Sequence, residues 1–321
     1  MSQLKTNSIT NIGNTGDDNI TLNSDGSTVV QDLTATSYNT GQLAGFRNQL
    51  INGQFQIDQR GMSGVELAGS KYCLDRWFAS STAVVTILNK NPGGLPNAIS
   101  YTGGNDPGYL RQAIELPFAG TTGQFGTPGL SWTFSVYSNT APEFEAFYAD
   151  GNTTTTRTNW VNLTTMTATG RTAASSTTGT LNQYSITISG SPAPASTNNC
   201  LVIAFRGGGF YAAAQFEPGP VATPFELRPI GTEQSLCERY IQLLPRLSMA
   251  PVTTNATSNR ASSVSFRTAM RATPTMTADQ DVRLNSVTIT NNNNFGLTVE
   301  GQATDPAASS YIRNLKFDAE L

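Results

Sequence analysis

One stretch of the sequence decides the fold: Gln215-Phe216-Glu217-Pro218-Gly219-Pro220-Val221-Ala222-Thr223-Pro224-Phe225-Glu226-Leu227-Arg228-Pro229. It is followed by Cys237-Glu238-Arg239-Tyr240. A second stretch lies upstream, begins at Leu50-Ile51-Asn52-Gly53-Gln54-Phe55 and continues to Asp75-Arg76-Trp77. Together the two stretches bracket about 180 residues of strand-like sequence, the length of one β-sandwich domain rather than of a short motif.

The bracketed sequence has the period of β-strands. Apolar and polar residues alternate over residues 130–136 and 184–188, which predicts strands with one buried face. Residues 200–205 form a continuous apolar run, typical of a central strand. Clusters of Gly, Pro and Asn, such as residues 102–108, separate these runs. The pattern predicts an all-β chain with an antiparallel β-sandwich.

Composition restricts the function. Of 321 residues only 13% are charged, the net charge is −3, and no basic run marks a nucleic-acid site. No apolar run approaches the roughly 20 residues of a membrane helix, so we expect no membrane insertion. Residues 1–30 lack the apolar core of a secretory signal, so we expect the protein to stay in the cytoplasm where it is made, or to leave it within a particle released by lysis. The absence of histidine excludes His-based general bases, catalytic triads and His-ligated metals.

Four segments are predicted. Residues 1–42 are polar and weakly patterned, and they read as an extended arm with short strands at 19–22 and 27–30 that orders against a partner; the alternative is a disordered tail. Residues 43–231 form the sandwich, introduced by a short helical turn over 43–53. The other two segments are a linking helix at 232–245 and a smaller β domain at 246–321.

The linking helix is predicted from three signals. Thr232 is a candidate N-cap, the leucines and Tyr240 form one apolar stripe, and Pro245 ends the pattern. The C-terminal domain has about 75 residues and few large side chains, so it would be marginal alone and favours self-association.

The three cysteines match neither a zinc site nor a disulfide framework. We expect Cys73, Cys200 and Cys237 to be buried free thiols, with a Cys73–Cys200 bridge as the open alternative.

The bracketing motifs carry a resemblance. An N-G-x-F opening (Asn52, Gly53, Phe55), a D-R-W (Asp75, Arg76, Trp77) and a closing A-T-P-F-E-x-R (with Phe225, Glu226, Arg228) are followed by C-x-R-Y. In order and spacing, over roughly residues 45–245, this pattern resembles a β-sandwich module of bacteriophage tail fibres and other virion surface proteins. That module is similar to the jelly-roll domains of carbohydrate-binding modules.

The resemblance implies a virion structural protein, most specifically a tail fibre. It implies a homotrimer, attachment to other tail or capsid proteins through residues 1–42, and display of a sandwich that binds host surface polysaccharide. The motif residues would encode the fold rather than the ligand. Trp77 would anchor the core, Asp75 and Arg76 would form an ion pair, and Phe225 would be buried beside a Glu226–Arg228 pair.

Four aromatic residues are the candidate glycan contacts, because sugar rings stack on aromatic faces. Tyr101 and Tyr109 flank one Gly-rich loop, and Tyr148 and Trp160 flank another. The alternative is that these rings are half-buried strand residues.

Catalysis and metal binding are weakly signalled. Glu143 and Glu145 would share one face of a strand, as a glycan-cleaving pair requires, but they equally suit the solvated face of an edge strand with Phe144 pointing inward. A structural Ca²⁺ would use Asp58, Asp75, Asp106 or Glu217, although none has EF-hand spacing. We therefore expect no cofactor and no enzyme activity. The alternatives are a capsid decoration or tail-adaptor protein without a receptor, and a glycan depolymerase.

Overall fold

The computed structural model describes residues 20–22, 28–30, 46–79, 83–88, 94–95, 97–103, 109–116, 131–150, 157–175, 178–190, 195, 198–207, 209–249, 259–279, 284–303 and 310–320. The chain divides into two units, residues 1–43 and residues 44–321. In the first unit β1 (Ile20–Leu22) pairs antiparallel with β2 (Thr28–Val30), so the two short strands predicted there are confirmed.

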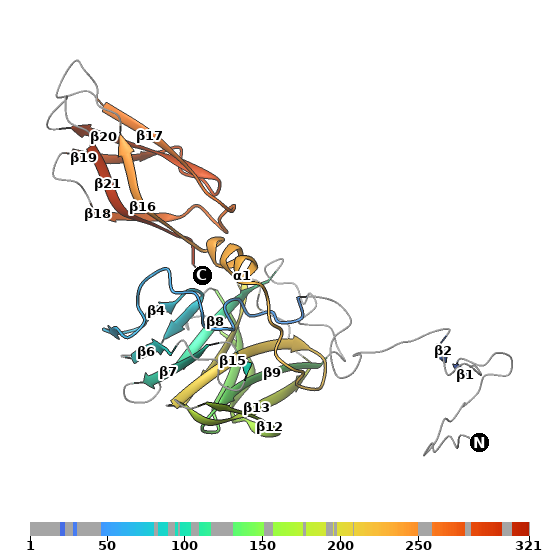
Figure 1. The fold of residues 1–321 in the computed structure, drawn as a ribbon. Coiled ribbons are helices and arrows are strands. Elements are labelled where there is room, and N and C mark those ends of the chain that lie inside the picture. The colour runs from blue at the N-terminus through green and yellow to red at the C-terminus, as the bar shows by residue number, and fades with distance from the viewer. Residues whose placement is uncertain are drawn as a thin grey trace. The chain divides into compact units, whose positions relative to one another are not determined.

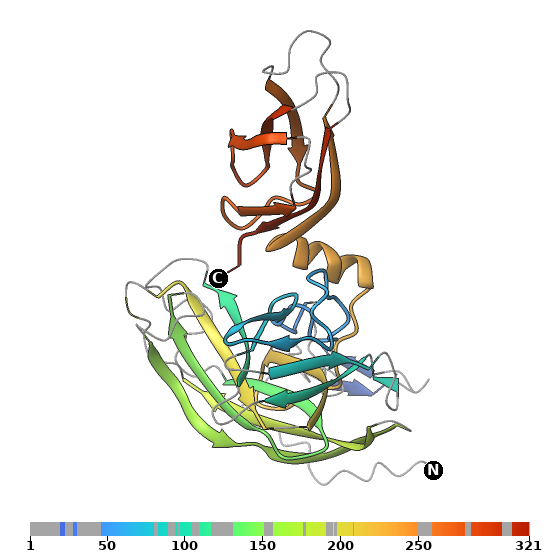
Figure 2. The same cartoon turned by 90° about the vertical axis from the view of Figure 1, so that its left-hand side faces the viewer.

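The second unit begins with an antiparallel β-sandwich, as the sequence predicts (Figures 1 and 2). One sheet has six strands, in the order β11 (Thr158–Thr165), β10 (Glu143–Ala149), β14 (Cys200–Arg206), β8 (Tyr109–Glu115), β5 (Trp77–Ala79) and β4 (Lys71–Leu74). The other has seven, in the order β12 (Thr167–Ser175), β13 (Gly179–Ser189), β9 (Ser131–Ser138), β15 (Gly209–Pro218), β7 (Ala98–Gly103), β6 (Ala83–Ile87) and β3 (Glu66–Leu67). Successive strands or hairpins fall alternately in the two sheets, which gives a jelly-roll-like sandwich.

Aromatic side chains from both sheets fill the space between them. Phe134 of β9 stacks on Phe144 of β10 with ring centroids 4.9 Å apart, and Trp132 stacks on Phe216 at 5.0 Å. Such contacts add to the free energy of burying the rings themselves. Alternate residues of each strand therefore face this core, and the residues between them form the outer faces of the sandwich.

The opening and closing motifs meet in a buried polar network. Asn52 has a φ of 56°, and its side-chain amide donates to the carbonyls of Ile57 (2.8 Å) and Asp75 (3.0 Å) and accepts from the backbone N–H of Gln56 (3.0 Å) and Ile57 (3.1 Å). The indole of Trp77 donates to the Asn52 carbonyl at 2.9 Å. These bonds fold residues 51–57 into turns, so the predicted helical lead-in, which would leave the bonds unmade, is wrong for the described residues 46–53.

The closing motif binds the same segment from the other side. Glu226 accepts the backbone N–H groups of Phe46 (2.9 Å) and Asn48 (2.8 Å), and it lies 3.6 Å from Arg228 as predicted. Arg228 is buried and has a closer partner in Glu233, at 2.6 Å. Phe225 is only partly buried, because it packs at the rim of a small outer cluster rather than in the core between the sheets.

The Asp75–Arg76 ion pair is wrong. Asp75 accepts instead from the backbone N–H (2.9 Å) and side-chain amide (2.6 Å) of Gln59. Arg76 is buried, forms an ion pair with Glu320, and lies with its guanidinium carbon 3.4 Å from the ring centroid of Tyr240. The two adjacent side chains point to different partners, and the true partner of Arg76 is 244 residues away in the sequence.

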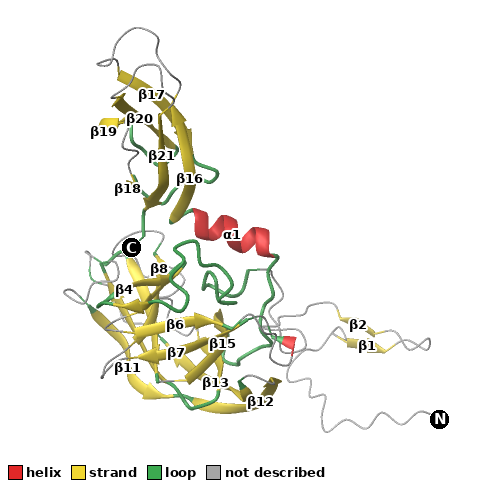
Figure 3. Ribbon diagram, turned by 60° about the vertical axis from the view of Figure 1, so that its left-hand side comes forward, coloured by secondary structure: helices red, strands yellow, loops and turns green. Residues whose placement is uncertain are grey.

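The linking helix is shorter than predicted. α1 spans Ile230–Glu238, with Pro229 rather than Thr232 at its N-cap, and Figure 3 shows it between the sandwich and the C-terminal strands. Leu243 and Leu244 belong instead to β16 (Ile241–Met249), which pairs with β21 (Ser310–Asp318). Pro245 is tolerated because β16 is an edge strand, where a missing N–H breaks no essential ladder.

The C-terminal module is all-β, as predicted, but it begins at residue 241 rather than 246. It contains two three-stranded sheets, ordered β16-β21-β18 and β17-β20-β19. Their remaining bounds are β17 (Asn259–Ser265), β18 (Thr275–Asp279), β19 (Leu284–Thr290) and β20 (Gly296–Ala303). Val299, Ile312, Leu315 and Phe317 form a core of their own between the sheets. The predicted turn at 291–294 joins β19 to β20.

Candidate functional site

The outer face of the six-stranded sheet carries a cluster of charged and aromatic side chains. Strand register places Phe78, Arg111, Ala204 and Glu145 in one row across β5, β8, β14 and β10. The next row of the same face contains Tyr109, Arg206 and Glu143. Because residues two apart on a strand share a face, these two rows form one continuous surface.

Most charges of this surface are paired. Arg206 donates to Glu143 at 2.6 Å and has its guanidinium carbon 5.5 Å from the ring centroid of Tyr109. Arg157, just before β11, donates to Glu145 at 3.2 Å and covers the ring of Phe147 at 4.5 Å. The pairs hold the four charged groups in defined positions, with part of each arginine still exposed.

Arg111 differs from its neighbours. Only 9% of its surface is exposed, its guanidinium carbon lies 4.7 Å from the ring centroid of Phe78, and it takes part in none of the ion pairs of the described residues. Its Nε is buried without a hydrogen-bond partner. Burial lowers the pKa of the Arg111 guanidinium, and the charge of Glu145 opposes that effect only in part.

We call this surface the arginine face; its members are Tyr109, Arg111, Glu143, Glu145, Arg157 and Arg206. Three arginines against two glutamates leave it with one excess positive charge, on a chain whose net charge is −3. The face offers planar N–H donors, carboxylate acceptors and an aromatic ring. These are the groups that bind sugar hydroxyls and C–H faces.

The aromatic residues predicted to bind glycans are mostly elsewhere. Tyr101 is 2% exposed and Tyr148 is 1% exposed, because their side chains point into the core between the sheets, so neither ring can stack on a sugar. Trp160 is half-buried, and its indole donates to the Gly190 carbonyl at 2.7 Å while its ring stacks on Tyr148. Of the four, Tyr109 alone lies on the arginine face.

Sequence reasoning missed the arginines of this face. Arg206 ends the strand that the sequence predicts from residues 200–205, and that continuous apolar run has no period to show which way Arg206 points. Arg111 lies within β8, out of phase with Leu110 and Ile114, so the period-two pattern could have assigned Arg111 to an outer face. It could not have shown which arginine lacks a partner, because that depends on the order of the strands in the sheet.

The two glutamates considered for catalysis do share a face, and Phe144 points inward as predicted. β10 is, however, an inner strand between β11 and β14 rather than an edge strand. Each glutamate is bound to an arginine, Glu145 to Arg157 at 3.2 Å and Glu143 to Arg206 at 2.6 Å. A glycosidase needs two carboxyl groups that face the bond to be cleaved, so this arrangement does not suit glycan cleavage.

The carboxylates considered for Ca²⁺ have protein partners. Asp58 caps the backbone N–H groups of Met62 (3.0 Å) and Ser63 (2.7 Å), Asp75 binds Gln59, and Glu217 binds Thr223. Asp106 lies outside the described residues. Within the described part of the chain, no three His, Cys, Asp or Glu residues gather as a metal site would require.

All three cysteines are buried and unbridged, which confirms the prediction of free thiols. Burial raises the pKa of the Cys73 thiol to about 12, so this thiol is a packing group rather than a nucleophile. Among the described residues, no helix has the length and apolar character needed to span a bilayer.

Comparisons with known proteins give little further information. No protein-family model matches the chain, and no curated protein matches it in sequence. Two structures of discoidin II from Dictyostelium discoideum, the wild-type and the recombinant protein, align with 70% of this chain. The two alignments cover 80% and 82% of the discoidin chains, at 10% sequence identity and with TM-scores of 0.21 and 0.19. At these TM-scores the alignment carries no functional information, so the sandwich assignment rests on the strand pairing described above.

Proposed function

We propose that this chain is a non-enzymatic binding protein whose β-sandwich attaches to host surface glycans through the arginine face. The observation that carries the proposal is the pairing on that face: its carboxylates are held as acceptors beside arginines and are not placed as an acid and a nucleophile. Fixed donors and acceptors beside an aromatic ring suit recognition of sugars.

We further propose that the chain is a virion appendage, most specifically a phage tail fibre, that attaches to the particle through residues 1–42. Support comes from the resemblance of the bracketing motifs and from the division of the chain into residues 1–43 and residues 44–321. The motif residues build the framework of the sandwich, since Asn52 and Trp77 form the opening turn and Glu226 binds the segment that precedes it.

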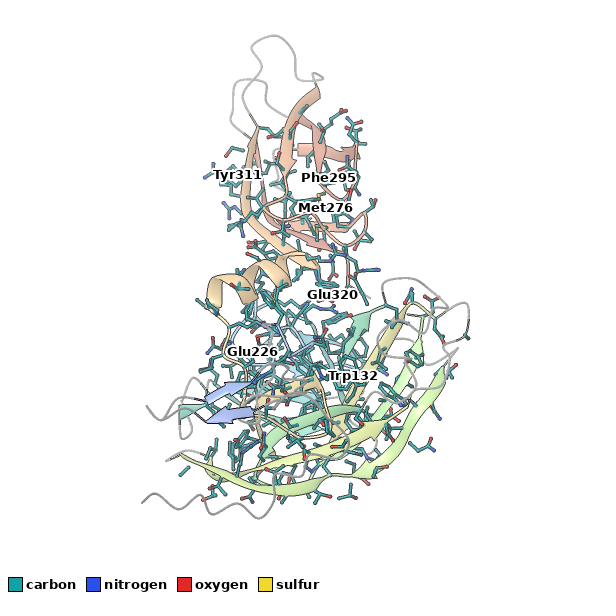
Figure 4. The ribbon with its side chains drawn as sticks, turned by 90° about the vertical axis from the view of Figure 1, so that its right-hand side faces the viewer. Trp132, Glu226, Met276, Phe295, Tyr311 and Glu320 are labelled. Carbon is teal, nitrogen blue, oxygen red and sulfur yellow. The ribbon has the colours of Figure 1, made fainter. Side chains whose placement is uncertain are left out.

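A homotrimer is part of the same proposal. The C-terminal module exposes open edges at β16, β17, β18 and β19, and Phe295 is 68% exposed at its surface (Figure 4). Open edges and exposed aromatic rings favour association between copies. Several copies would also multiply weak glycan contacts by valency.

Adsorption tests the proposed function. The purified full-length chain should bind bacterial cells and their extracted surface polysaccharide, and Arg206→Ala together with Arg157→Ala should weaken this binding. If the protein binds purified phage particles but neither cells nor polysaccharide, the capsid-decoration or tail-adaptor alternative holds instead.

A further inference from the structure

Arg111 is the feature of the arginine face that the fold does not explain. It is nine-tenths buried on a face where Glu143, Glu145, Arg157 and Arg206 each have a partner of opposite charge. An unpaired buried cation is costly, and burial indeed lowers its pKa. A residue that only filled space over Phe78 could be apolar at no such cost.

The surroundings of Arg111 indicate what it could bind. Its guanidinium carbon lies over the Phe78 ring, and its Nε is buried without a hydrogen-bond partner among the described residues. A guanidinium carries its N–H donors in one plane, as a fork that fits a carboxylate. Across the row, Ala204 separates Arg111 from Glu145. Two strand spacings, or about 10 Å, therefore lie between the backbones of Arg111 and Glu145, and the side chain between them is only a methyl group.

We propose that Arg111 binds the carboxylate of an acidic sugar, such as a uronic acid residue within a host surface glycan. Carboxylate is the group whose geometry matches a guanidinium fork, in two parallel charged hydrogen bonds. The neighbouring Glu143 and Glu145 accept the sugar hydroxyls, and Tyr109 lies beside them for the apolar face of the ring. The inference rests on the proposed function and specifies the class of glycan.

Binding of matched oligosaccharides tests the inference. The full-length protein is titrated with glucuronate- and galacturonate-containing oligosaccharides and with the same compounds after chemical reduction of every carboxyl to an alcohol. The acidic forms should bind roughly tenfold or more tightly than the reduced forms, because a charged bidentate contact is lost on reduction. The preference should also decline as salt is raised.

Variants locate the contact. Arg111→Met keeps the packing over Phe78 and removes the charge, so it should abolish the preference for acidic forms, and Arg111→Lys should retain only part of it. Because Arg111→Met removes an unpaired buried charge, its unfolding midpoint in urea should equal or exceed that of the parent. The control is Arg313→Met, which removes an arginine that lies 4.8 Å from the Tyr311 ring centroid in the C-terminal module, and which should leave binding unchanged.

The outcomes distinguish failure of the Arg111 contact from failure of glycan binding as a whole. Acidic preference that survives in Arg111→Met overturns the assignment of Arg111. Equal binding of acidic and reduced oligosaccharides overturns the acidic ligand but leaves glycan binding intact. Failure to bind either form, in a protein that also ignores neutral host polysaccharide, overturns the proposed function and the inference together.

Discussion

Asn52 shows how a single side chain can specify a turn. Its amide makes four hydrogen bonds inside the protein, two as donor and two as acceptor, where water does not reach. Asn52→Ala should lower the free energy of unfolding by about 3 kcal/mol or more, because it leaves buried backbone groups without partners. Urea denaturation measures the loss. Asn159→Ala, at an exposed position, is the control and should change stability by less than about 0.5 kcal/mol; equal effects would contradict the role of Asn52.

Asp75 should make stability depend on pH. Burial raises the pKa of its carboxyl to about 6 in the folded protein, against 3.8 for the ordinary group, although hydrogen bonds from Gln59 oppose the shift. The folded state therefore holds this proton more tightly than the unfolded state does. Its contribution to stability is largest below pH 4, declines between about pH 4 and pH 6, and stays constant above that range.

Asp75→Asn removes this titration. The stability of the parent relative to Asp75→Asn should rise by up to about 3 kcal/mol between pH 7 and pH 4, measured by urea denaturation at each pH. A difference that stays constant over this range, or that falls on acidification, would contradict the raised pKa.

Close packing between elements depends on glycine at one position. A Cβ on Gly53 would lie 2.3 Å from the Ala214 carbonyl oxygen of β15, and that carbonyl is backbone that cannot move without disturbing the sheet. Gly53→Ala should therefore destabilise the sandwich by about 2 kcal/mol or more. Gly231→Ala in α1, where a Cβ meets nothing within 4 Å, should be neutral or stabilising by up to about 1 kcal/mol. Urea denaturation of both variants decides whether this contact joins the opening motif to β15.

At the scale of elements, the sequence predicted strands well and one boundary poorly. The described part of the alternating run at 130–136, residues 131–136, lies within β9, and the run at 184–188 lies within β13. A strand with one buried face leaves a clear period in the sequence. The sequence predicts a helix that continues through Leu243 and Leu244, because their spacing also fits a helical stripe. In the structure these residues make a ladder with β21, some 70 residues away in the sequence, and local periodicity carries no trace of that pairing.

Local periodicity also limits what the sequence can show of the site residues. The sequence places Tyr101 and Tyr148 beside loops, as candidate glycan contacts or half-buried strand residues, and in the structure each lies at a strand position that points into the core. The phase of Tyr148 could have been obtained from Phe144, which lies four residues earlier on the same face of β10. Local sequence patterns cannot show which segments of the chain contact one another. They therefore could not show that Arg76 pairs with Glu320, or that Arg111 has no ion-pair partner among the described residues.

At the scale of the whole molecule, the last residues of the chain fasten the C-terminal module to the sandwich. Glu320, labelled in Figure 4, pairs with Arg76 and with Arg60 (3.2 Å), and Asp318 pairs with Arg60 at 2.8 Å. All but Asp318 have side chains less than a tenth exposed, so removing one partner leaves a buried charge.

Glu320→Gln should therefore separate the unfolding of the two parts of residues 44–321. Calorimetry should show one transition for the parent and two for the variant. All tryptophans precede the C-terminal module in the sequence, so the transition at lower temperature should leave tryptophan fluorescence unchanged if it belongs to that module. The control is Glu300→Gln, a change of the same kind on β20 inside the module. A single, unshifted transition in Glu320→Gln would show that the C-terminal residues do not couple the parts.

The arm belongs to this scale as well. Removal of residues 1–40 should leave a folded protein of unchanged oligomeric state, measured by sedimentation, that no longer enters particles during infection. Incorporation of the truncated chain would show that attachment lies elsewhere in the sequence.

Binding of host glycans without their cleavage is the proposed activity of the sandwich. To test it, full-length protein is incubated with extracted host surface polysaccharide, and bound polysaccharide and newly formed reducing ends or unsaturated sugars are followed in the same sample. We expect saturable binding that Arg111→Met weakens for acidic polysaccharide, with no new chain ends over time. New chain ends that accumulate with time, or no binding by a correctly folded protein, would refute the proposal.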